Sequence, residues 1–251
     1  MLGCSSAVSG ETCSPTFFDD FDKPLEQSAW RVIEGNGCDV DLCGWGNNEA
    51  QHYHRDSVAI RDGVLEITAS TRGERIISGK LVTQGQFTQR YGRFEARIKL
   101  PSGRGLWPAF WMMPDSPNRW PLAGEIDIME WTGHEPERLI GAAHFGPLPP
   151  NNVHYSETLL KPVPWDAQWH DFAVEWQTDR IEWIVDGVSH AVMTPEAIAP
   201  YPWVFDNAEF YLILNVAVGG TLGGVVYPED LPATMLVDWV RVLPRSCLEN
   251  R

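Results

Sequence analysis

Hydrophobic positions recur with a two-residue period in many short segments of the chain. In residues 91–100, Phe94, Ala96, Ile98 and Leu100 alternate with charged side chains, and successive side chains of a β-strand point to opposite faces. Comparable strand signals, some of them continuous apolar runs, occur at residues 17–21, 58–61, 64–69, 80–87, 106–113, 124–131, 139–145, 172–176, 181–185, 188–192, 210–218 and 235–242. The chain is therefore predicted to consist mainly of β-strands.

The spacing of these strands predicts an all-β sandwich. The Asp186-Gly187 pair supplies the positive φ angles of a type I′ hairpin turn, and the only helical signal is one turn at residues 195–198. Strands without a long helical period indicate two packed antiparallel sheets, and a large curved sheet can present a concave cleft to a polymer. We expect a loose arm over residues 1–16, which are small and polar, and a single domain over residues 17–251.

The charge balance limits the possible partners. The formal net charge of −15 argues against nucleic acid or an anionic membrane surface. No apolar run approaches the roughly 20 residues of a membrane helix. We therefore expect a soluble monomer that acts on a neutral substrate, with neither nucleic acid nor membrane as a partner.

Five cysteines are present. Cys38 and Cys43 enclose a short loop and could form one disulfide, and Cys13 could pair with Cys247 if the terminal strands are neighbours. No C-x-x-C motif or nearby Cys/His pair completes a zinc site. Leu2-Gly3-Cys4 resembles the end of a lipoprotein signal without its apolar region. We expect an exported protein, secreted or held at the cell surface, whose signal segment is absent from this chain.

Three carboxylates lie within one apolar, β-prone segment, residues 124–133, which reads G-E-I-D-I-M-E-W-T-G. An ionised carboxylate that loses water without a partner is strongly disfavoured or shifts its pKa. In a strand, Glu125 and Asp127 share one face, and strict alternation would send Glu130 to the apolar face. One extra residue around Ile128-Met129, a β-bulge, would return Glu130 to the other two, and bulges are common beside active sites.

Two interpretations of this acidic segment are open. The three acids could form the solvated outer face of a half-buried strand. Alternatively, they could form a two-carboxylate glycosidase site, where one group stays ionised as the nucleophile and another holds a proton at neutral pH. Retaining chemistry needs carboxyl groups about 5–5.5 Å apart, which same-face neighbours on a bulged strand can provide. The flanking sequence favours the second interpretation.

The segment Gly124 to Glu130 resembles the E-x-D-x-x-E signature of glycoside hydrolase family 16. Three further blocks are similar to the laminarinase branch of that family, the endo-β-1,3-glucanases: Tyr91 to Pro101, Leu106 to Pro114 and Leu214 to Gly220. The resemblance extends from about Phe17 to Val242. It implies a concanavalin-like β-jelly-roll sandwich and a double displacement that retains anomeric configuration. It also implies Glu125 as nucleophile, Glu130 as general acid/base and Asp127 between them, tuning the charge of the pair.

Tryptophans near these blocks are candidates for sugar contacts. An indole face packs well on the C–H face of a pyranose, which suggests Trp107, Trp111 and Trp120 as substrate-binding residues; the alternative for any of them is burial in the core. The resemblance also implies that His144 lies near the catalytic carboxylates, although a core histidine is the alternative.

Polar residues are implied at the same cleft. Asn47 and Glu49 match a segment that lines the non-reducing side of the cleft in the family, and Asn215 matches a cleft-facing position. Where the family has an S-G-R element whose arginine reaches the cleft, this chain has Lys80. Lysine cannot donate a planar fork of hydrogen bonds, so the resemblance does not carry the arginine's sugar contact over to this position.

The resemblance also implies a possible structural calcium ion on the convex side. Asp20, Gly63 and Asp238 fall at the matching positions, and hard oxygen ligands suit calcium, while ordinary surface acids are the alternative. No cofactor is expected to be required for catalysis.

The sequence therefore predicts a secreted, retaining endo-β-1,3-glucanase that hydrolyses a laminarin-like polysaccharide. Another polysaccharide on the same scaffold, such as mixed-linkage β-1,3-1,4-glucan, agar or a galactan, is an alternative because the signature does not determine the linkage. A non-catalytic β-glucan-binding module is a further alternative, although such a module would be expected to lack one or both catalytic glutamates.

Overall fold

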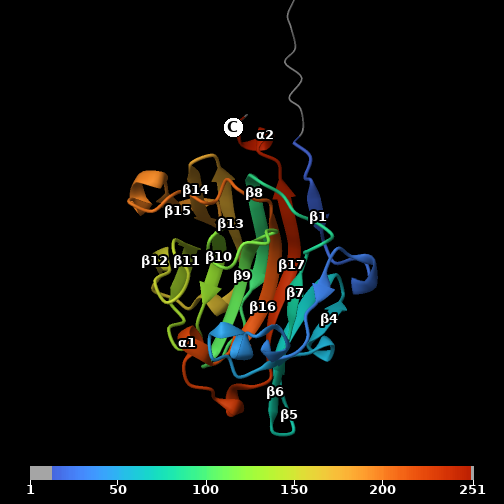
Figure 1. The fold of residues 1–251 in the computed structure, drawn as a ribbon. Helices are drawn as coiled ribbons and strands as arrows, with labels where there is room; N and C mark the ends of the chain where they lie inside the picture. Colours follow the sequence, from blue (N-terminus) through green and yellow to red (C-terminus); the bar gives the residue numbers. More distant parts are fainter. Residues whose placement is uncertain (1–12, 250–251) are drawn as a thin grey trace, which may run out of the picture.

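Two large sheets make up the protein in the computed structural model, which describes residues 13–249 (Figure 1). The seven-stranded sheet has the order β12 (Val153–Leu160), β11 (Arg138–Phe145), β10 (Glu125–Trp131), β9 (Leu106–Pro114), β16 (Phe210–Val218), β7 (Lys80–Val82) and β2 (Arg31–Val32). The ten-stranded sheet has the order β15 (Val188–Met193), β14 (Arg180–Val185), β13 (Trp169–Gln177), β8 (Gly92–Lys99), β17 (Ala233–Leu243), β5 (Val64–Arg72), β6 (Arg75–Ser78) and β3 (His52–Tyr53), with β1 (Phe17–Asp19) beside β17 and β4 (Val58–Arg61) beside β5. All pairs between these strands are antiparallel except β3 with β6. The predicted all-β jelly-roll sandwich is confirmed.

The hydrophobic core lies between the two sheets. Phe94, Ala96 and Ile98 of β8 are fully buried there, as their two-residue period predicted. Strand β16 is buried on both faces, because Ile213 and Asn215 on its second face are covered as well. A strand covered on both faces can carry a functional side chain in a shielded setting, and Asn215 is such a side chain.

Helical structure within residues 13–249 is limited to single turns. The 3-10 turns are Leu25–Gln27, Cys38–Val40, Cys43–Gly46, Arg55–Ser57, Trp165–Ala167, Pro195–Ile198 and Pro228–Asp230, and the α-helical turns are α1 (Gly220–Gly223) and α2 (Ser246–Glu249). The predicted turn at residues 195–198 is confirmed. The others were missed because a turn of three or four residues is too short to show a helical period. None of the described helices has the length and apolar character needed to cross a bilayer.

Both predicted disulfides are present. Cys38 is bonded to Cys43, and Cys13 is bonded to Cys247 across a sequence separation of 234. The amide of Thr16 also donates to the carbonyl of Val242 at 2.9 Å, so the start of the described chain lies along β17. Cys4 and most of the predicted N-terminal arm lie outside the described residues.

Candidate active site

Strand β10 contains the predicted bulge. Against β11, the register moves from Asp127 opposite Ala142 to Glu130 opposite Ile140, so three steps on β10 match two on its neighbour. The same shift appears against β9 between Asp127 and Met129. Ile128 and Met129 are therefore both buried in the core, while Glu130 is half-buried like Glu125. The extra residue turns Glu130 away from the apolar interior, which strict alternation would not do.

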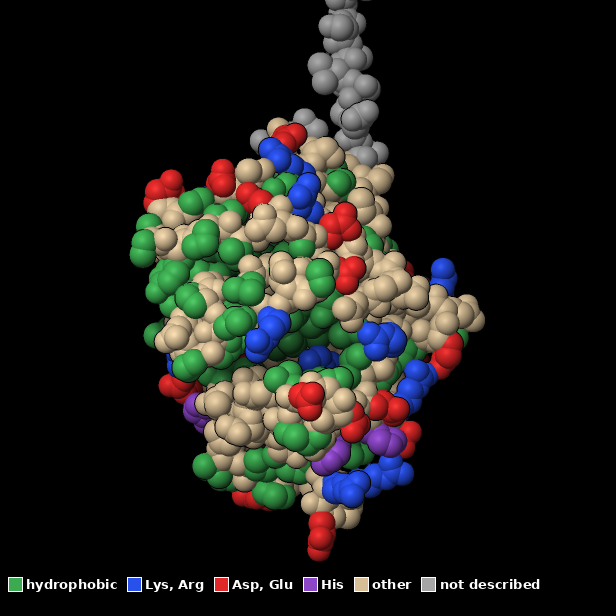
Figure 2. All heavy atoms as spheres, viewed as in Figure 1, with side chains coloured by type: hydrophobic (Ala, Val, Ile, Leu, Met, Phe, Trp, Pro, Cys, Tyr) green, Lys and Arg blue, Asp and Glu red, His purple; other side chains and the backbone are tan. Residues whose placement is uncertain are grey.

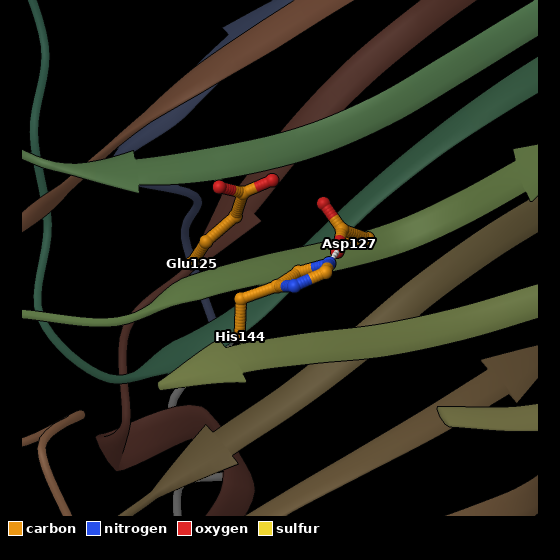
Figure 3. Close-up of side chains that lie close together, drawn as sticks. All are labelled: Glu125, Asp127 and His144. Atoms are coloured by element: carbon orange, nitrogen blue, oxygen red, sulfur yellow. Dashed lines mark ion pairs between the residues drawn. The ribbon is translucent and has the colours of Figure 1, made fainter. Parts of the chain in front are cut away.

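Asp127 is the most deeply buried of the three acids. Its side chain is 4% exposed, and its Oδ2 lies 3.3 Å from Nε2 of His144 on β11. Figure 3 shows Glu125 and Asp127 rising from the same strand, with the imidazole of His144 reaching toward Asp127 from the neighbouring one. Trp183 donates its indole N–H to the backbone carbonyl of Asp127 at 2.8 Å and so holds the strand where the bulge begins.

Two tryptophans donate hydrogen bonds to the outer carboxylates. Trp107 Nε1 donates to Glu130 Oε1 at 2.9 Å, and Trp120 Nε1 donates to Glu125 Oε2. An indole N–H is a donor only, so each bond favours the ionised form of its carboxylate. The sequence suggested these residues as stacking platforms for sugars; it did not reveal that they hold the two glutamates.

Burial raises the pKa of all three acids. For Glu125, burial, reinforced by the negative charge of Asp127, raises the pKa from its ordinary 4.5 to about 8. Burial raises the pKa of Glu130 from 4.5 to about 7. The pKa of Asp127 is raised well above its ordinary value, first by burial and then by the charge of Glu130. Because these groups interact, protons leave them as a set, and the cluster retains at least one proton near neutral pH.

The strand registers place further polar residues on the face that carries Glu130. Lys80 of β7 is opposite Asn215 of β16, Asn215 is opposite Ala109 of β9, and Ala109 is opposite Glu130. Residues directly opposite one another in a sheet point to the same side. Figure 2 shows this side of the molecule hollowed across its middle, over the centre of the seven-stranded sheet seen in Figure 1.

A chain of hydrogen bonds runs along one end of this hollow. Trp111 Nε1 donates to Asn215 Oδ1 at 2.7 Å, and Asn215 Nδ2 donates to the hydroxyl of Tyr53 at 3.0 Å. That hydroxyl donates to Glu49 Oε2 at 3.2 Å, and Asn47 Nδ2 donates to Glu49 Oε1 at 3.2 Å. The structure thus brings together the predicted residues Asn47, Glu49, Trp111 and Asn215.

Residues 46–239 match the model of the family described as glycosyl hydrolases family 16. The chain belongs to this family. It is accordingly a glycoside hydrolase, and the strand with Glu125, Asp127 and Glu130 falls inside the matched region.

Individual family members agree with this assignment. The beta-glucanase of Rhodothermus marinus is 39% identical over 229 residues, which cover 81% of this chain and 77% of that protein. The glucan endo-1,3-beta-glucosidase A1 of Niallia circulans is 36% identical over 247 residues, which cover 87% of this chain but 36% of that longer protein. The solved laminarinase catalytic domain of Thermotoga maritima MSB8 has a TM-score of 0.84 at 34% identity, covering 92% of this chain and 98% of that one.

Lys80 of this family-16 hydrolase is enclosed by aromatic rings. Its Nζ lies 4.5 Å from the ring centroid of Trp45, 4.9 Å from that of Trp111 and 5.7 Å from that of Tyr53. Burial lowers the pKa of Lys80 from 10.5 to about 8, although the charges of Glu49 and Glu125 oppose this effect. Cation–π contacts hold the ammonium in place of the forked hydrogen bonds that an arginine would make.

Two residues at this end of the hollow were not singled out from the sequence. Trp45 lies in the turn that follows the Cys38–Cys43 disulfide, and its ring packs on Tyr53 with centroids 5.4 Å apart. Gln51 is fully buried and donates to Glu49 Oε2 at 2.6 Å. Trp45 also contacts Lys80 of β7, and Gln51 accepts the backbone N–H of Val218 of β16, so part of their surroundings comes from strands far away in sequence.

Asp20 lies near Gly63, and Asp238, the third predicted calcium ligand, pairs with Arg97. A Cβ added to Gly63 would lie 4.0 Å from the backbone oxygen of Asp20. The carboxylate of Asp238 lies 3.5 Å from Arg97 Nε. A structural calcium ion at these three residues stays a prediction.

A different set of possible metal ligands lies within the acidic cluster itself. One ligand atom from each of Glu125, Asp127 and His144 falls within 4.8 Å of the others (Figure 3). Trp120 donates its indole N–H to Glu125, one member of this set, as it would to a hydrogen-bonded acid.

Proposed function

We propose that this family-16 hydrolase is a retaining endo-β-1,3-glucanase that hydrolyses laminarin-like polysaccharides. The observation that carries the proposal is the bulge in β10, which returns Glu130 to the face of Glu125. The similarity to a laminarinase over 98% of that chain supports the substrate class. The disulfides Cys13–Cys247 and Cys38–Cys43 support secretion, because such bonds persist in oxidising surroundings.

In the proposed first step, a carboxylate oxygen of Glu125 attacks the anomeric carbon of the donor sugar. Glu130 simultaneously gives its proton to the glycosidic oxygen, and the leaving chain departs with a new hydroxyl group. In the second step, ionised Glu130 takes a proton from water, and the resulting oxygen displaces Glu125. Two inversions at one carbon retain its configuration.

The environment of Glu125 acts on its proposed role in two directions. Burial and the charge of Asp127 raise its pKa to about 8, whereas the charge of His144 and the indole N–H of Trp120 favour the ionised form that a nucleophile needs. A pKa of about 7 keeps a proton on Glu130 up to neutral pH, as a general acid requires. Burial and the charge of Glu130 raise the pKa of Asp127, which is buried between them, while its hydrogen bond with Glu125 favours the ionised form of Asp127 and the protonated form of Glu125.

The remaining cleft residues are proposed to bind sugar. The ring faces of Trp107, Trp111 and Trp120 suit the apolar faces of glucose units. Asn47, Glu49, Asn215, Lys80 and His144 offer hydrogen-bonding groups beside them. No cofactor takes part in the proposed steps, and a calcium ion held by Asp20, Gly63 and Asp238 would have a structural role.

The roles of the two glutamates can be tested by chemical rescue. Glu125→Gly should lose nearly all hydrolysis, and azide should restore turnover of an activated aryl glycoside with inverted product. Glu130→Gly should yield a retained azide product, because azide then attacks the glycosyl-enzyme. Glu135→Gln, at an exposed acid outside β10, serves as the control, which should keep turnover and show no response to azide. An inverted product from the Glu130 variant would reverse the assignment.

The substrate can be tested with a reducing-sugar assay on laminarin, lichenan, agarose and galactan. We expect laminarin to be cleaved fastest, with a mixture of short oligosaccharides rather than one terminal product. Preference for another polymer would exclude the proposed linkage. Binding to laminarin without release of reducing ends would favour the non-catalytic module.

A further inference from the structure

Lys161, His170 and Asp186 form a hydrogen-bonded series away from β10. Lys161 Nζ lies 3.0 Å from His170 Nε2, and His170 Nδ1 lies 2.7 Å from Asp186 Oδ2. Lys161 follows the end of β12, His170 lies on β13, and Asp186 lies in the turn between β14 and β15. Because a carboxylate only accepts, His170 donates from Nδ1 to Asp186, which leaves its Nε2 lone pair for Lys161.

The surroundings hold this series in place. Asp186 Oδ1 accepts the backbone N–H of Asp171 at 2.9 Å, which fixes the carboxylate. His170 is buried, and the ring of Trp165 packs edge-on against it with centroids 5.0 Å apart. The ammonium of Lys161 lies 3.7 Å from the ring centroid of Trp165. The amine therefore has one geometry relative to the imidazole.

Lys161 combines this fixed geometry with access to solvent. Its side chain is half-buried, so a small molecule can reach it. Burial lowers the pKa of Lys161 below its ordinary 10.5, although the charges of Asp186 and Asp166 oppose that change. A carboxylate that orients an imidazole, which in turn accepts a proton from a nucleophile, is the arrangement that activates hydroxyl and thiol nucleophiles in enzymes.

We propose that Lys161, with His170 and Asp186 behind it, is a nucleophilic amine that condenses with aldehydes. The relevant class is the open-chain form of reducing sugars, because every cut by a glycoside hydrolase releases a new reducing end. The proposal needs only glycoside hydrolysis and does not depend on which linkage is cut.

The condensation is balanced without an oxidant or reductant. Lys161 gives a proton to His170 Nε2, and the freed lone pair of its nitrogen attacks the aldehyde carbon. The carbonyl oxygen receives a proton, the resulting carbinolamine loses one water molecule, and an imine forms. His170 can then move a proton from the neighbouring carbon of the sugar to complete the rearrangement to a ketoamine. The result is a sugar covalently attached to the side chain of Lys161.

The chain has four lysines, Lys23, Lys80, Lys99 and Lys161, so site selectivity can be measured directly. The intact protein is incubated with glycolaldehyde or laminaribiose at about pH 7 with cyanoborohydride, which traps imines. Peptides from a protease that cleaves after acidic residues then report the labelling rate at each lysine. We expect Lys161 to react at least about tenfold faster than exposed Lys23, because His170 accepts the proton that the attacking amine must lose.

Variants distinguish the effect of His170 and Asp186 on the reactivity of Lys161 from the effect of its exposure to solvent. His170→Gln and Asp186→Asn should each reduce labelling of Lys161 to the rate of Lys23, while melting temperature and hydrolytic activity identify a variant that has kept its fold. Lys161→Arg should abolish the fast label and leave hydrolysis unchanged. Equal labelling of all four lysines would overturn the proposal, as would undiminished labelling of Lys161 in either folded variant. The glycolaldehyde arm supplies its own aldehyde, so its result is independent of the proposed glucanase activity.

Discussion

Replacing Glu130 by Gln should stabilise the protein at alkaline pH while abolishing hydrolysis. Gln keeps the oxygen that accepts the 2.9 Å hydrogen bond from Trp107 but cannot ionise in the half-buried site. The wild-type carboxyl group has a raised pKa of about 7, against an ordinary value of 4.5. Ionising it in the folded state therefore opposes folding, and the substitution removes that opposition.

The expected magnitude follows from proton linkage. Below about pH 4.5, both the folded and the unfolded chain hold the proton at residue 130, so the two proteins should be equally stable. Between 4.5 and about 7, the unfolded chain loses this proton while the folded chain keeps it, and wild-type stability falls as pH rises. Each pH unit in that window is worth about 1.4 kcal/mol. Allowing for partial exposure and for coupling to Asp127, we expect about 1–3 kcal/mol above pH 7.

Thermal unfolding across this pH range provides the assay. For a protein of this size, about 2 kcal/mol corresponds to roughly 4–8 °C in Tm. Glu135→Gln is the matched control with the opposite sign, because the hydrogen bond from Arg138 lowers the pKa of Glu135. That control should gain no stability as pH rises. A Tm difference at Glu130 that is independent of pH, or a variant less stable than wild type at pH 8, would refute the reasoning.

Three further outcomes are expected. With a pKa of about 8, Lys80 carries its positive charge below that pH and loses it above. The KM should therefore rise above pH 8 in the wild type but not in Lys80→Arg, which stays charged. Parallel pH profiles of KM in the two proteins would contradict this. Gly141→Ala would place a Cβ 2.5 Å from Trp183, whose indole N–H donates to the carbonyl of Asp127. The substitution should lower the free energy of unfolding by about 1–3 kcal/mol and reduce kcat. Unchanged unfolding and turnover would count against it. Chelation of calcium should lower the Tm of the wild type but not of Asp238→Asn, and an unaltered wild-type Tm would remove the proposed ion.

The sequence was most informative where a local pattern determined the structure. The two-residue period of β8 identified its buried face, and the conflict at Glu130 predicted a bulge before any neighbour of β10 was known. Both rest on the alternation of side chains within one strand. The pairing of Cys13 with Cys247 was also accessible, because it required only that the terminal strands lie side by side.

The sequence was least informative about contacts between distant segments. No local pattern indicates that Trp107 and Trp120 donate hydrogen bonds to the glutamates, since a tryptophan beside an acid in the sequence can equally face the core. The enclosure of Lys80 joins Trp45 and Tyr53 to β7 and β9, and the Lys161–His170 contact joins a loop to β13. Such contacts depend on strand order and register, which only the folded sheets establish.

The single extra residue in β10 lets the strand bury both Ile128 and Met129 and still present Glu130 on the face that carries Glu125. Everything before Ile128 follows one alternation, and everything after Met129 follows the alternation displaced by one position. Loss of one codon at this point would give a regular strand that still carries Glu130 on the face of Glu125 and Asp127, but with one residue fewer, about 3.4 Å of strand, between the two glutamates. The separation of the two glutamates is therefore set by the length of a single residue, with the rest of the sequence unchanged.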